Sequence, residues 1–488
     1  MKTSCACLGP NVIQSNRSPG ICLSKILASF MVFASLGPIT AYSQTAVLYD
    51  GARLIIGDLS APIENGAFVV QNGVITAIGA KGAVNAPSGA TRVDLTGKTV
   101  MPALVNIHVH LAWELFTPYG DVPAAPDNFT LDNLVDHLQR EAFYGVGTVN
   151  DGGSGVISVE QQFQAEQAAK KLPPAARLSI MAGVVAPDGG PDGVLIWGTR
   201  PRHASYEVLR APEARKAVQD IADKKIHQLK IWYTDRNGSY PEMPAPVYAA
   251  VIDEAHKHGI LVHAHATSWR EQKDSLKAGV DVLVHTVSNT PPDDEMVALL
   301  KEKKPYWTPV MGLGDHSDMC DRDPFVEQTM PTKVIAEVQA SNTCRPGAGG
   351  GGRGGAVSPA AREAALKTSF TTMIASGARL VLGSDSGVFP RYAIGWADHH
   401  EMGMYVRLGA TPAQAIIAST SRAAEALGLK DVGMLATGRK ADFIVLNANP
   451  LDDIKNTRQI SAVYLGGAKV DREGLLAQWK KSYELSLR

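Results

Sequence analysis

The stretch MPALVNIHVH at residues 101–110 decides the fold, because it joins a short apolar run to two histidines. His108 and His110 are two positions apart, so in a strand both side chains point to the same side. Seven more apolar runs of strand length follow, with segments of helical periodicity between them. The eight expected strands are Leu104–His110, Gly147–Asp151, Leu178–Val185, Gln228–Tyr233, Leu261–His265, Val282–Thr286, Tyr306–Met311 and Leu380–Asp385.

Eight apolar strands that alternate with helices predict an α/β fold in which the strands form a parallel (β/α)8 TIM-like barrel. A doubly wound open sheet is the alternative. No Gly-x-Gly-x-x-Gly pattern opens a helix after the first strand, which disfavours a dinucleotide-binding sheet. We therefore assign residues 101–430 to a barrel.

Residues on both sides of this region have the pattern of short strands separated by Asp-Gly, Asn-Gly and Gly-rich turns. Residues 44–100 and 431–475 are expected to build one small β-sandwich domain together. The expected strands are Ala46–Tyr49, Arg53–Ile56, Ala67–Gln71, Val74–Ile78, Thr91–Asp94, Ala441–Asn447 and Ile460–Leu465, with Gly466-Gly467 closing a hairpin.

The first 43 residues have the pattern of an export signal. Their only charges are Lys2, Arg17 and Lys25, and an apolar run from residue 26 to about residue 39 follows, with small residues before a cleavage position after Ser43. A membrane anchor is the alternative, but the run is shorter than the roughly 20 residues that a spanning helix needs. We therefore expect a secreted or periplasmic protein without membrane contact after cleavage.

The composition is that of a soluble globular protein, with 45% hydrophobic and 19% charged residues among 488. The formal net charge of −1 becomes −4 when the three positive charges of the leader are removed. Such a mild charge favours neither a nucleic acid nor a membrane as partner and leaves a small-molecule substrate. Two cysteines remain after the leader, Cys320 and Cys344, and they form either a disulfide or two free thiols. The glycine-rich insertion near 345–358 predicts a surface loop, which is either a lid or a tolerated insertion.

Residues that can ligate a metal end several of the expected strands, at the carboxyl ends where barrels carry their active sites. Besides His108 and His110 they are Lys230, His265, His285 and Asp385. Nitrogen and oxygen ligands without a thiolate favour Zn²⁺ or a similar ion at a catalytic site. Six groups exceed the needs of one tetrahedral ion, so two divalent ions account for them if Lys230 is a bridging carbamate. Otherwise Lys230 is only a lysine of the barrel interior.

Residues 101–110 resemble the segment that opens the barrel of the amidohydrolase superfamily, here its imidazolonepropionase and metal-dependent prolidase (Xaa-dipeptidase) branch, which includes ochratoxin-type amidases. The resemblance covers nearly everything after the leader. Other similar segments are KIW at 230–232, VHAHA at 262–266, VH at 284–285, GSDSG at 383–387, HE at 400–401, GATP at 409–412 and GRKAD at 438–442.

The resemblance implies a role for each candidate residue. His108, His110 and Asp385 would hold a buried ion, His265 and His285 a more exposed one, and Lys230 would bridge the two as a carbamate. A metal lowers the pKa of bound water from about 15.7 towards about 7, so Asp385 would act as the catalytic residue that takes this proton and returns it to the leaving amine. The metal would also polarise the substrate carbonyl, so that water can attack it and no protein nucleophile is needed.

Two positions depart from the usual pattern. The opening Pro-Gly-Leu-Ile-Asp is PALVN at 102–106, which places the neutral amide of Asn106 where an acid is common. Ser268 stands where a carboxylate often follows the fifth-strand histidine, which disfavours the deaminase branches and favours amide hydrolysis. His263 lies two residues before His265 and is the alternative ligand on that strand. Tyr233 and His400 are weaker candidates for substrate contact, and His399-His400 is expected on an exposed segment.

The leading hypothesis is an exported amidase or dipeptidase, expected as a homo-oligomer, that acts on a small substrate such as a dipeptide or an N-acyl amino acid. A lactonase, an esterase or a cyclic amidohydrolase would use the same metal centre. A non-catalytic metal-binding scaffold is a different class of protein, and it predicts an eroded ligand set, whereas every expected ligand type is present here. No Gly-x-Ser-x-Gly motif appears, which disfavours a serine hydrolase.

Overall fold

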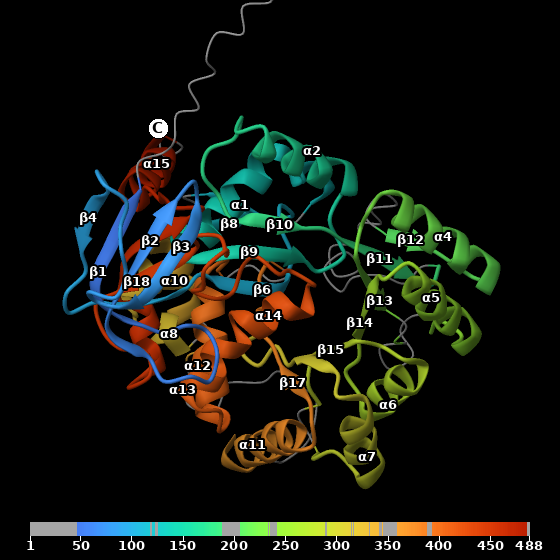
Figure 1. Cartoon of the computed structure of the whole chain (residues 1–488). Helices are drawn as coiled ribbons and strands as arrows, with labels where there is room; N and C mark the ends of the chain where they lie inside the picture. The colour runs from blue at the N-terminus through green and yellow to red at the C-terminus, as the bar shows by residue number, and fades with distance from the viewer. Residues whose placement is uncertain are drawn as a thin grey trace, which may run out of the picture. The chain divides into compact units, whose positions relative to one another are not determined.

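The computed structural model describes most of the chain after the leader (Figure 1). Residues 44–488 form one compact unit. The described residues are 46–117, 120–122, 125–187, 205–232, 234, 242–287, 290–313, 315, 317–330, 332–340, 344, 359–387 and 393–485. The glycine-rich insertion near 345–358 and the side chain of Tyr233 therefore lie outside the described residues.

Strands from both ends of the chain pair in one eight-stranded sheet, as the sequence predicts. The order is β20-β19-β18-β5-β1-β2-β3, and β4 also pairs with β1. The two halves meet where β5 runs antiparallel to β18, with Val100 opposite Val445. The strands are β1 (Val47–Leu54), β2 (Ile63–Gln71), β3 (Val74–Ala80), β4 (Thr91–Asp94), β5 (Thr99–Pro102), β18 (Phe443–Leu446), β19 (Ile460–Leu465) and β20 (Ala468–Lys469). The sandwich arrangement and the predicted domain boundaries stay predictions.

The sheet contains a buried aromatic cluster and a register shift at one glycine. Tyr49, Phe68 and Phe443 are buried against one another, with ring centroids 4.9–5.1 Å apart. The two strands expected at 46–49 and 53–56 are one strand, β1, whose register shifts between Asp50 and Ala52. Gly51 permits this irregularity because its φ is +89° and a Cβ would lie 2.6 Å from Oγ1 of Thr96.

Parallel strands overlap all eight of the predicted segments between these two halves, the eighth at Leu380 alone. The third predicted strand is divided at Ile180: β10 pairs with β9, and β11 pairs with β13. The order in the larger parallel sheet is β12-β11-β13-β14-β15-β16-β17, and in the smaller one β10-β9-β6. The strands are β6 (Leu104–Val109), β9 (Val146–Asp151), β10 (Arg177–Ser179), β11 (Met181–Val185), β12 (Ser205–Glu207), β13 (Gln228–Trp232), β14 (Leu261–His265), β15 (Val282–Val284), β16 (Tyr306–Thr308) and β17 (Arg379–Leu380).

Backbone hydrogen bonds join the segment after β17 to β6, the first parallel strand. The amide of Ile107 donates to the carbonyl of Leu382 at 2.9 Å, and the amide of Asp385 donates to the carbonyl of His108 at 2.8 Å. The last and the first of the predicted strand segments are therefore neighbours, and their polar ends lie side by side.

Helices cover the outer side of the parallel strands (Figure 1). Their starts carry polar caps: Ser268 accepts from the amide of Glu271, and the Glu271 side chain accepts in return from the amide of Ser268. Ser268 therefore begins a helix. The main helices are α1 (Leu131–Phe143), α2 (Ile157–Ala168), α4 (Ala211–Asp223), α5 (Ala245–Lys257), α6 (Trp269–Ala278), α7 (Asp294–Lys303), α10 (Thr332–Ala340), α11 (Pro359–Ala375), α12 (Trp396–Leu408), α13 (Pro412–Ala418), α14 (Ser421–Ala426) and α15 (Arg472–Leu485).

Shorter elements complete the described chain. Cys320, at the end of α8, is bonded to Cys344, so the structure has the disulfide rather than two free thiols. Among the described residues, no helix combines the length and the apolar character that crossing a membrane requires. The shorter elements are β7 (Leu115–Thr117), β8 (Gly120–Val122), η1 (Pro126–Asn128), α8 (Ser317–Cys320), α9 (Pro324–Glu327) and η3 (Ile454–Arg458).

Candidate metal centre

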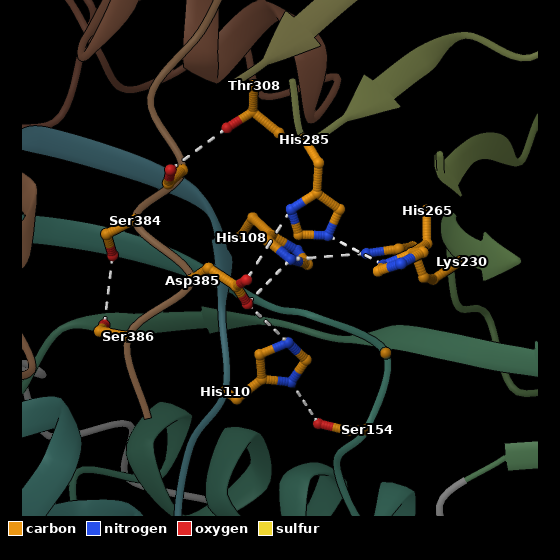
Figure 2. A network of polar contacts seen from close by, with 12 residues as sticks. His108, His110, Ser154, Lys230, His265, His285, Thr308, Ser384, Asp385 and Ser386 are labelled. Carbon is orange, nitrogen blue, oxygen red and sulfur yellow. Dashed lines mark hydrogen bonds and ion pairs between the residues drawn. The ribbon is translucent and has the colours of Figure 1, made fainter. Parts of the chain in front are cut away.

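His108, His110 and Asp385 converge at the carboxyl ends of their strands (Figure 2). The Nε2 atom of His108 lies 3.2 Å from Oδ1 of Asp385, and Nε2 of His110 lies 3.1 Å from the same oxygen. All three side chains are buried. His108 lies in β6 and His110 directly follows it, so the two-residue spacing brings both imidazoles to the same carboxylate, as the sequence predicts.

The backbone around these residues is shaped to hold them. Asp385 has a φ of +56°, a left-handed conformation that costs free energy in a residue other than glycine and turns its side chain towards β6. The amide of His110 donates to the carbonyl of Ser386 at 2.8 Å, which fastens the two segments together. At Gly387 a Cβ would lie only 1.8 Å from the carbonyl oxygen of His110, so this approach requires glycine.

Lys230, His265 and His285 form a second group beside the first (Figure 2). The Nε2 atom of His285 lies 2.9 Å from Nδ1 of His265. His285 also reaches the first group, with its Nδ1 atom 4.0 Å from Oδ2 of Asp385. The Nζ atom of Lys230 lies 3.5 Å from Nε2 of His108. The structure therefore brings all six sequence-predicted residues together.

The sequence predicts that Lys230 ends its strand, and the structure contradicts this prediction. It is the middle residue of β13, opposite His263 of β14 and Gly183 of β11. Its side chain is fully buried and reaches the metal-ligand candidates from one layer below the strand ends. The prediction was wrong because the strand continues through Ile231 and Trp232. The depth of a side chain along the strand depends on the register with the neighbouring strands, which the sequence does not show.

The protonation of these groups suits a cation. Burial, and then the positive charge of Lys230, holds the pKa of His108 well below its usual value. Burial alone would raise the pKa of Asp385, but His108 and His110 hold it well below its usual range. A neutral imidazole and an ionised carboxylate thus direct lone pairs towards the same point.

Two further features of the donor set fit a divalent ion: the spacing of its atoms, and a buried oxygen of Asp385 without a hydrogen-bond partner. Ligand atoms about 2.1 Å from a tetrahedral ion lie about 3.4 Å from one another, and the two Nε2–Oδ1 separations are 3.1 and 3.2 Å. The buried Oδ1 atom of Asp385 accepts no hydrogen bond within the described structure. Such a buried acceptor is costly unless a cation or a donor meets it.

Ser154 and Asn106 contact the ligand candidates His110 and His108, a function that the sequence alone does not indicate. Oγ of Ser154 lies 2.6 Å from Nδ1 of His110, the ring nitrogen that points away from Asp385. The side-chain oxygen of Asn106 accepts from the amide of His108 at 2.8 Å, and its Nδ2 donates to Oγ of Ser384 at 2.8 Å. The Ser154 contact is of the kind that fixes the ring orientation of a metal-ligating histidine, whereas Asn106 holds the backbone of His108.

The alternative ligand and the weaker substrate candidates lie elsewhere. Nε2 of His263 lies 2.8 Å from Oε1 of Gln228, while His265 meets His285. Burial first, then the charge of Lys230, keeps the pKa of His263 well below its usual value.

His399 and His400 are buried in α12, so the expectation of an exposed segment was wrong. His400 stacks on Trp396, and its Nδ1 atom lies 2.9 Å from Asp318. It packs between elements because α12 is covered by α8 on that side.

A profile described as the amidohydrolase family matches residues 144–470. The chain belongs to the amidohydrolase family. The sequence-based prediction of an amidohydrolase is thereby confirmed. Members of the wider amidohydrolase superfamily use divalent metals, and the cluster of His108, His110 and Asp385 is a possible site for one.

Individual amidohydrolases are similar to this chain over different lengths. Imidazolonepropionase from Deinococcus radiodurans is 38% identical over 104 residues, which is 20% of this chain and 25% of that protein, so the match spans about a quarter of its length. Ochratoxinase from Aspergillus niger is 24% identical over 500 residues, covering 94% of this chain and 91% of that protein. The crystal structure of a Xaa-Pro dipeptidase with bound methionine has a TM-score of 0.67 and 21% identity, covering 87% of this chain and 99% of that one. This structural similarity indicates a TIM-barrel-type α/β fold.

Proposed function

We propose that this amidohydrolase cleaves the carbon–nitrogen bond of an amide in a small substrate, such as a dipeptide or an N-acyl amino acid, with metal-activated water. The observation that carries the proposal is the convergence of His108, His110 and Asp385 on one buried point, with Lys230, His265 and His285 beside them. The similarity to proteins named ochratoxinase and Xaa-Pro dipeptidase supports this substrate class.

We propose two divalent ions, with Zn²⁺ as the metal. His108, His110 and Asp385 would hold one ion, and His265 and His285 the other. Lys230 would join the two groups as a carbamate, because an ammonium group cannot ligate a metal and its Nζ atom is 3.5 Å from Nε2 of His108. When bound, the metal would supply Lewis acidity, which lowers the pKa of water and polarises the substrate carbonyl.

Asp385 would move the proton. Its carboxylate is ionised near neutral pH, since His108 and His110 hold its pKa low. It can therefore accept a proton from the attacking water on Oδ1 or Oδ2. Because an amine is far more basic than this carboxylate, the proton then passes to the leaving nitrogen. Ser154 would keep the His110 imidazole oriented while this happens, and Asn106 would hold the backbone at His108.

The same reasoning extends to the architecture and the compartment. We propose that the parallel strands form a closed eight-stranded barrel, and the hydrogen bonds between Ile107 and Leu382 and between Asp385 and His108 support closure. We also propose a secreted or periplasmic location, because the Cys320–Cys344 disulfide suits an oxidising compartment. Assembly into a homo-oligomer is proposed as well, with a small molecule as the other partner.

The test combines metal analysis with hydrolysis. The purified protein is analysed for metal per chain and assayed for amino acid release from a panel of dipeptides, N-acyl amino acids, esters and lactones, before and after chelation. We expect about two ions per chain, amide hydrolysis that is lost on chelation and restored by Zn²⁺, and a loss of at least about a hundredfold in kcat for Asp385→Asn. Hydrolysis confined to esters or lactones would replace the substrate class, and a metal-free protein unaffected by chelation would refute the metal-dependent mechanism.

A further inference from the structure

A cavity of about 870 Å³ lies at the amino end of β17, at the opposite end of this segment from the metal centre. Arg379 and Leu380, the two residues of β17, line it, whereas Asp385 follows five residues after Leu380. Sites for small molecules have volumes of about 300–1,000 Å³, so this cavity has the size of such a site. It contains none of the six ligand candidates and is therefore separate from the metal centre.

Much of the cavity wall is apolar. Leu59 also lines the cavity, and its side chain is 75% exposed, although the large apolar side chains of the described chain are mostly buried. An exposed apolar side chain beside an apolar hollow marks a surface that gains free energy when an apolar group covers it. The apolar wall consists of Ile374, Leu380, Ile417, Leu429, Val432 and Met434, from α11, β17, α13 and the segment after α14.

The same cavity has an excess of positive charge. Glu425 forms an ion pair with Arg379, so these two charges compensate each other. Arg422 is half-buried and donates a hydrogen bond to the backbone carbonyl of Leu380 at 3.2 Å. Within the described residues, Arg422 forms no ion pair. The lining residues carry four positive and two negative groups, namely Arg379, Arg422, Lys430 and Arg439 against Asp58 and Glu425.

Arg422 is the group that calls for an anion. Burial, and then the neighbouring charge of Arg379, lowers the pKa of Arg422, but an arginine in a protein stays protonated. A half-buried charge without a partner costs free energy, which an anion beside it would recover. The planar guanidinium group matches the two oxygens of a carboxylate. The positive charge therefore selects an anionic head group, and the apolar wall selects an apolar body.

We propose that this cavity is a second binding site, which takes a small amphipathic carboxylate. The carboxylate pairs with Arg422, and the apolar body packs on the apolar wall and on Leu59. The site is independent of the proposed hydrolysis, since the cavity shares no residue with the metal centre.

The experiment measures binding of octanoate to the purified protein by isothermal titration calorimetry. Octanamide has the same apolar chain without the charge, octylamine has the opposite charge, and acetate has the charge without the chain. Octanoate is expected to bind at least about tenfold more tightly than each of the other three, because each lacks the charged contact or the apolar one. Equal affinity for octanoate and octanamide, or no binding of octanoate at millimolar concentration, would overturn the proposal.

Two variants locate the bound octanoate. Arg422→Gln keeps an N–H group that can donate to Leu380, and it is expected to bind octanoate at least about tenfold more weakly. Arg215→Gln is the matched control, because Arg215 is partly exposed and pairs with Asp253 and Glu254 away from the cavity, and its affinity is expected to be unchanged. Octanoate binding that Arg422→Gln leaves unchanged would place the ligand elsewhere, for example at the metal centre, and would overturn the proposal.

Leu59→Asn tests the apolar contact and serves if Arg422→Gln does not fold, since an exposed side chain can be replaced without loss of packing. It is expected to weaken octanoate binding by about threefold or more. Sedimentation velocity of the same variant detects the competing occupant, a second copy of the chain. Loss of self-association in Leu59→Asn, with octanoate binding unchanged, would make this face an interface between copies and overturn the proposal.

Discussion

His265 and His285 face each other with their ring planes 70° apart and Nε2 of His285 2.9 Å from Nδ1 of His265. They come from neighbouring parallel strand segments, β14 and the end of β15. His285 takes a φ of +78° directly after its strand, and this turn directs its ring back towards β14. The contact distinguishes His265 from His263, which the spacing along β14 alone leaves equivalent.

A first prediction follows from this contact. His265→Ala is expected to lower the bound metal from about two ions per chain to about one, since the second site loses half of its imidazole ligands. His263→Ala, the matched control on the same strand, is expected to keep both ions and to destabilise the fold, because it removes a buried partner of Gln228. Metal analysis and thermal unfolding of both variants measure this. Loss of a metal ion from the His263 variant alone would reverse the assignment.

The second prediction concerns the space beside the β6 histidines. A Cβ at Gly152 would lie 2.5 Å from Cε1 of His110 and 3.0 Å from Cε1 of His108. Gly152→Ala is therefore expected to displace both rings and to weaken metal binding by at least about tenfold.

A second glycine provides the control. Gly403 lies within α12, and a Cβ there would meet nothing within 4 Å. Gly403→Ala is expected to raise the free energy of unfolding by about 0.5–1 kcal/mol and to leave metal affinity unchanged. Equal metal affinity in the Gly152 and Gly403 variants would show that the rings tolerate displacement.

The third prediction is a pH dependence of stability. Burial, together with the charge of Asp398, raises the pKa of Glu141 well above its usual value, and burial raises the pKa of Asp398 to about 7. The folded protein therefore binds more protons than the unfolded one. The pair's contribution to stability is full below about pH 4 and is lost as the pH rises through about 7. Glu401, on the same helix, has a pKa raised by burial to about 8 and adds to the same trend.

Asp398→Asn is the variant that isolates the pair. It removes one titrating group while keeping the shape of the side chain, so the decrease of the unfolding free energy between pH 5 and 8 is expected to be smaller than in the unchanged protein. Glu363→Gln, at an exposed acid on α11, is the control and is expected to leave this slope as it is. Chemical unfolding at a series of pH values in the presence of a chelator provides the measurement. Parallel curves for the unchanged protein and Asp398→Asn would contradict the raised pKa of Asp398.

The fourth prediction concerns the disulfide. Cys320 and Cys344 are 24 residues apart in the sequence, and closing a loop of this length in the unfolded chain is worth about 3 kcal/mol. The paired variant Cys320→Ser/Cys344→Ser is therefore expected to lose about that much unfolding free energy. It should also become insensitive to reductant, which denaturant titrations with and without dithiothreitol would show. A native protein whose midpoint does not move on reduction would argue that the bond contributes nothing to stability.

The sequence by itself determined the order of the strands and the identity of the ligand candidates. The apolar runs are short and separated by helical patterns, and the period of two along β6 directs His108 and His110 to one side. The polar residue after each run then falls at the same end of parallel strands, which is why His265, His285 and Asp385 could be expected together. The pairing of the two chain ends was also predictable, since each has the same alternation of short strands and turns.

Only the tertiary structure decided how those residues relate to one another. Lys230 and His263 occupy a lower layer than His265, and layers are set by the register between strands, which has no signature in a single strand. The sequence indicated an exposed His400 because its partner Asp318, in α8, lies 82 residues earlier in the chain. The side-chain hydrogen bond between Asn106 and Ser384 joins residues 278 positions apart. Contacts of this kind depend on how helices pack on strands, and a linear pattern of residue types does not carry that information.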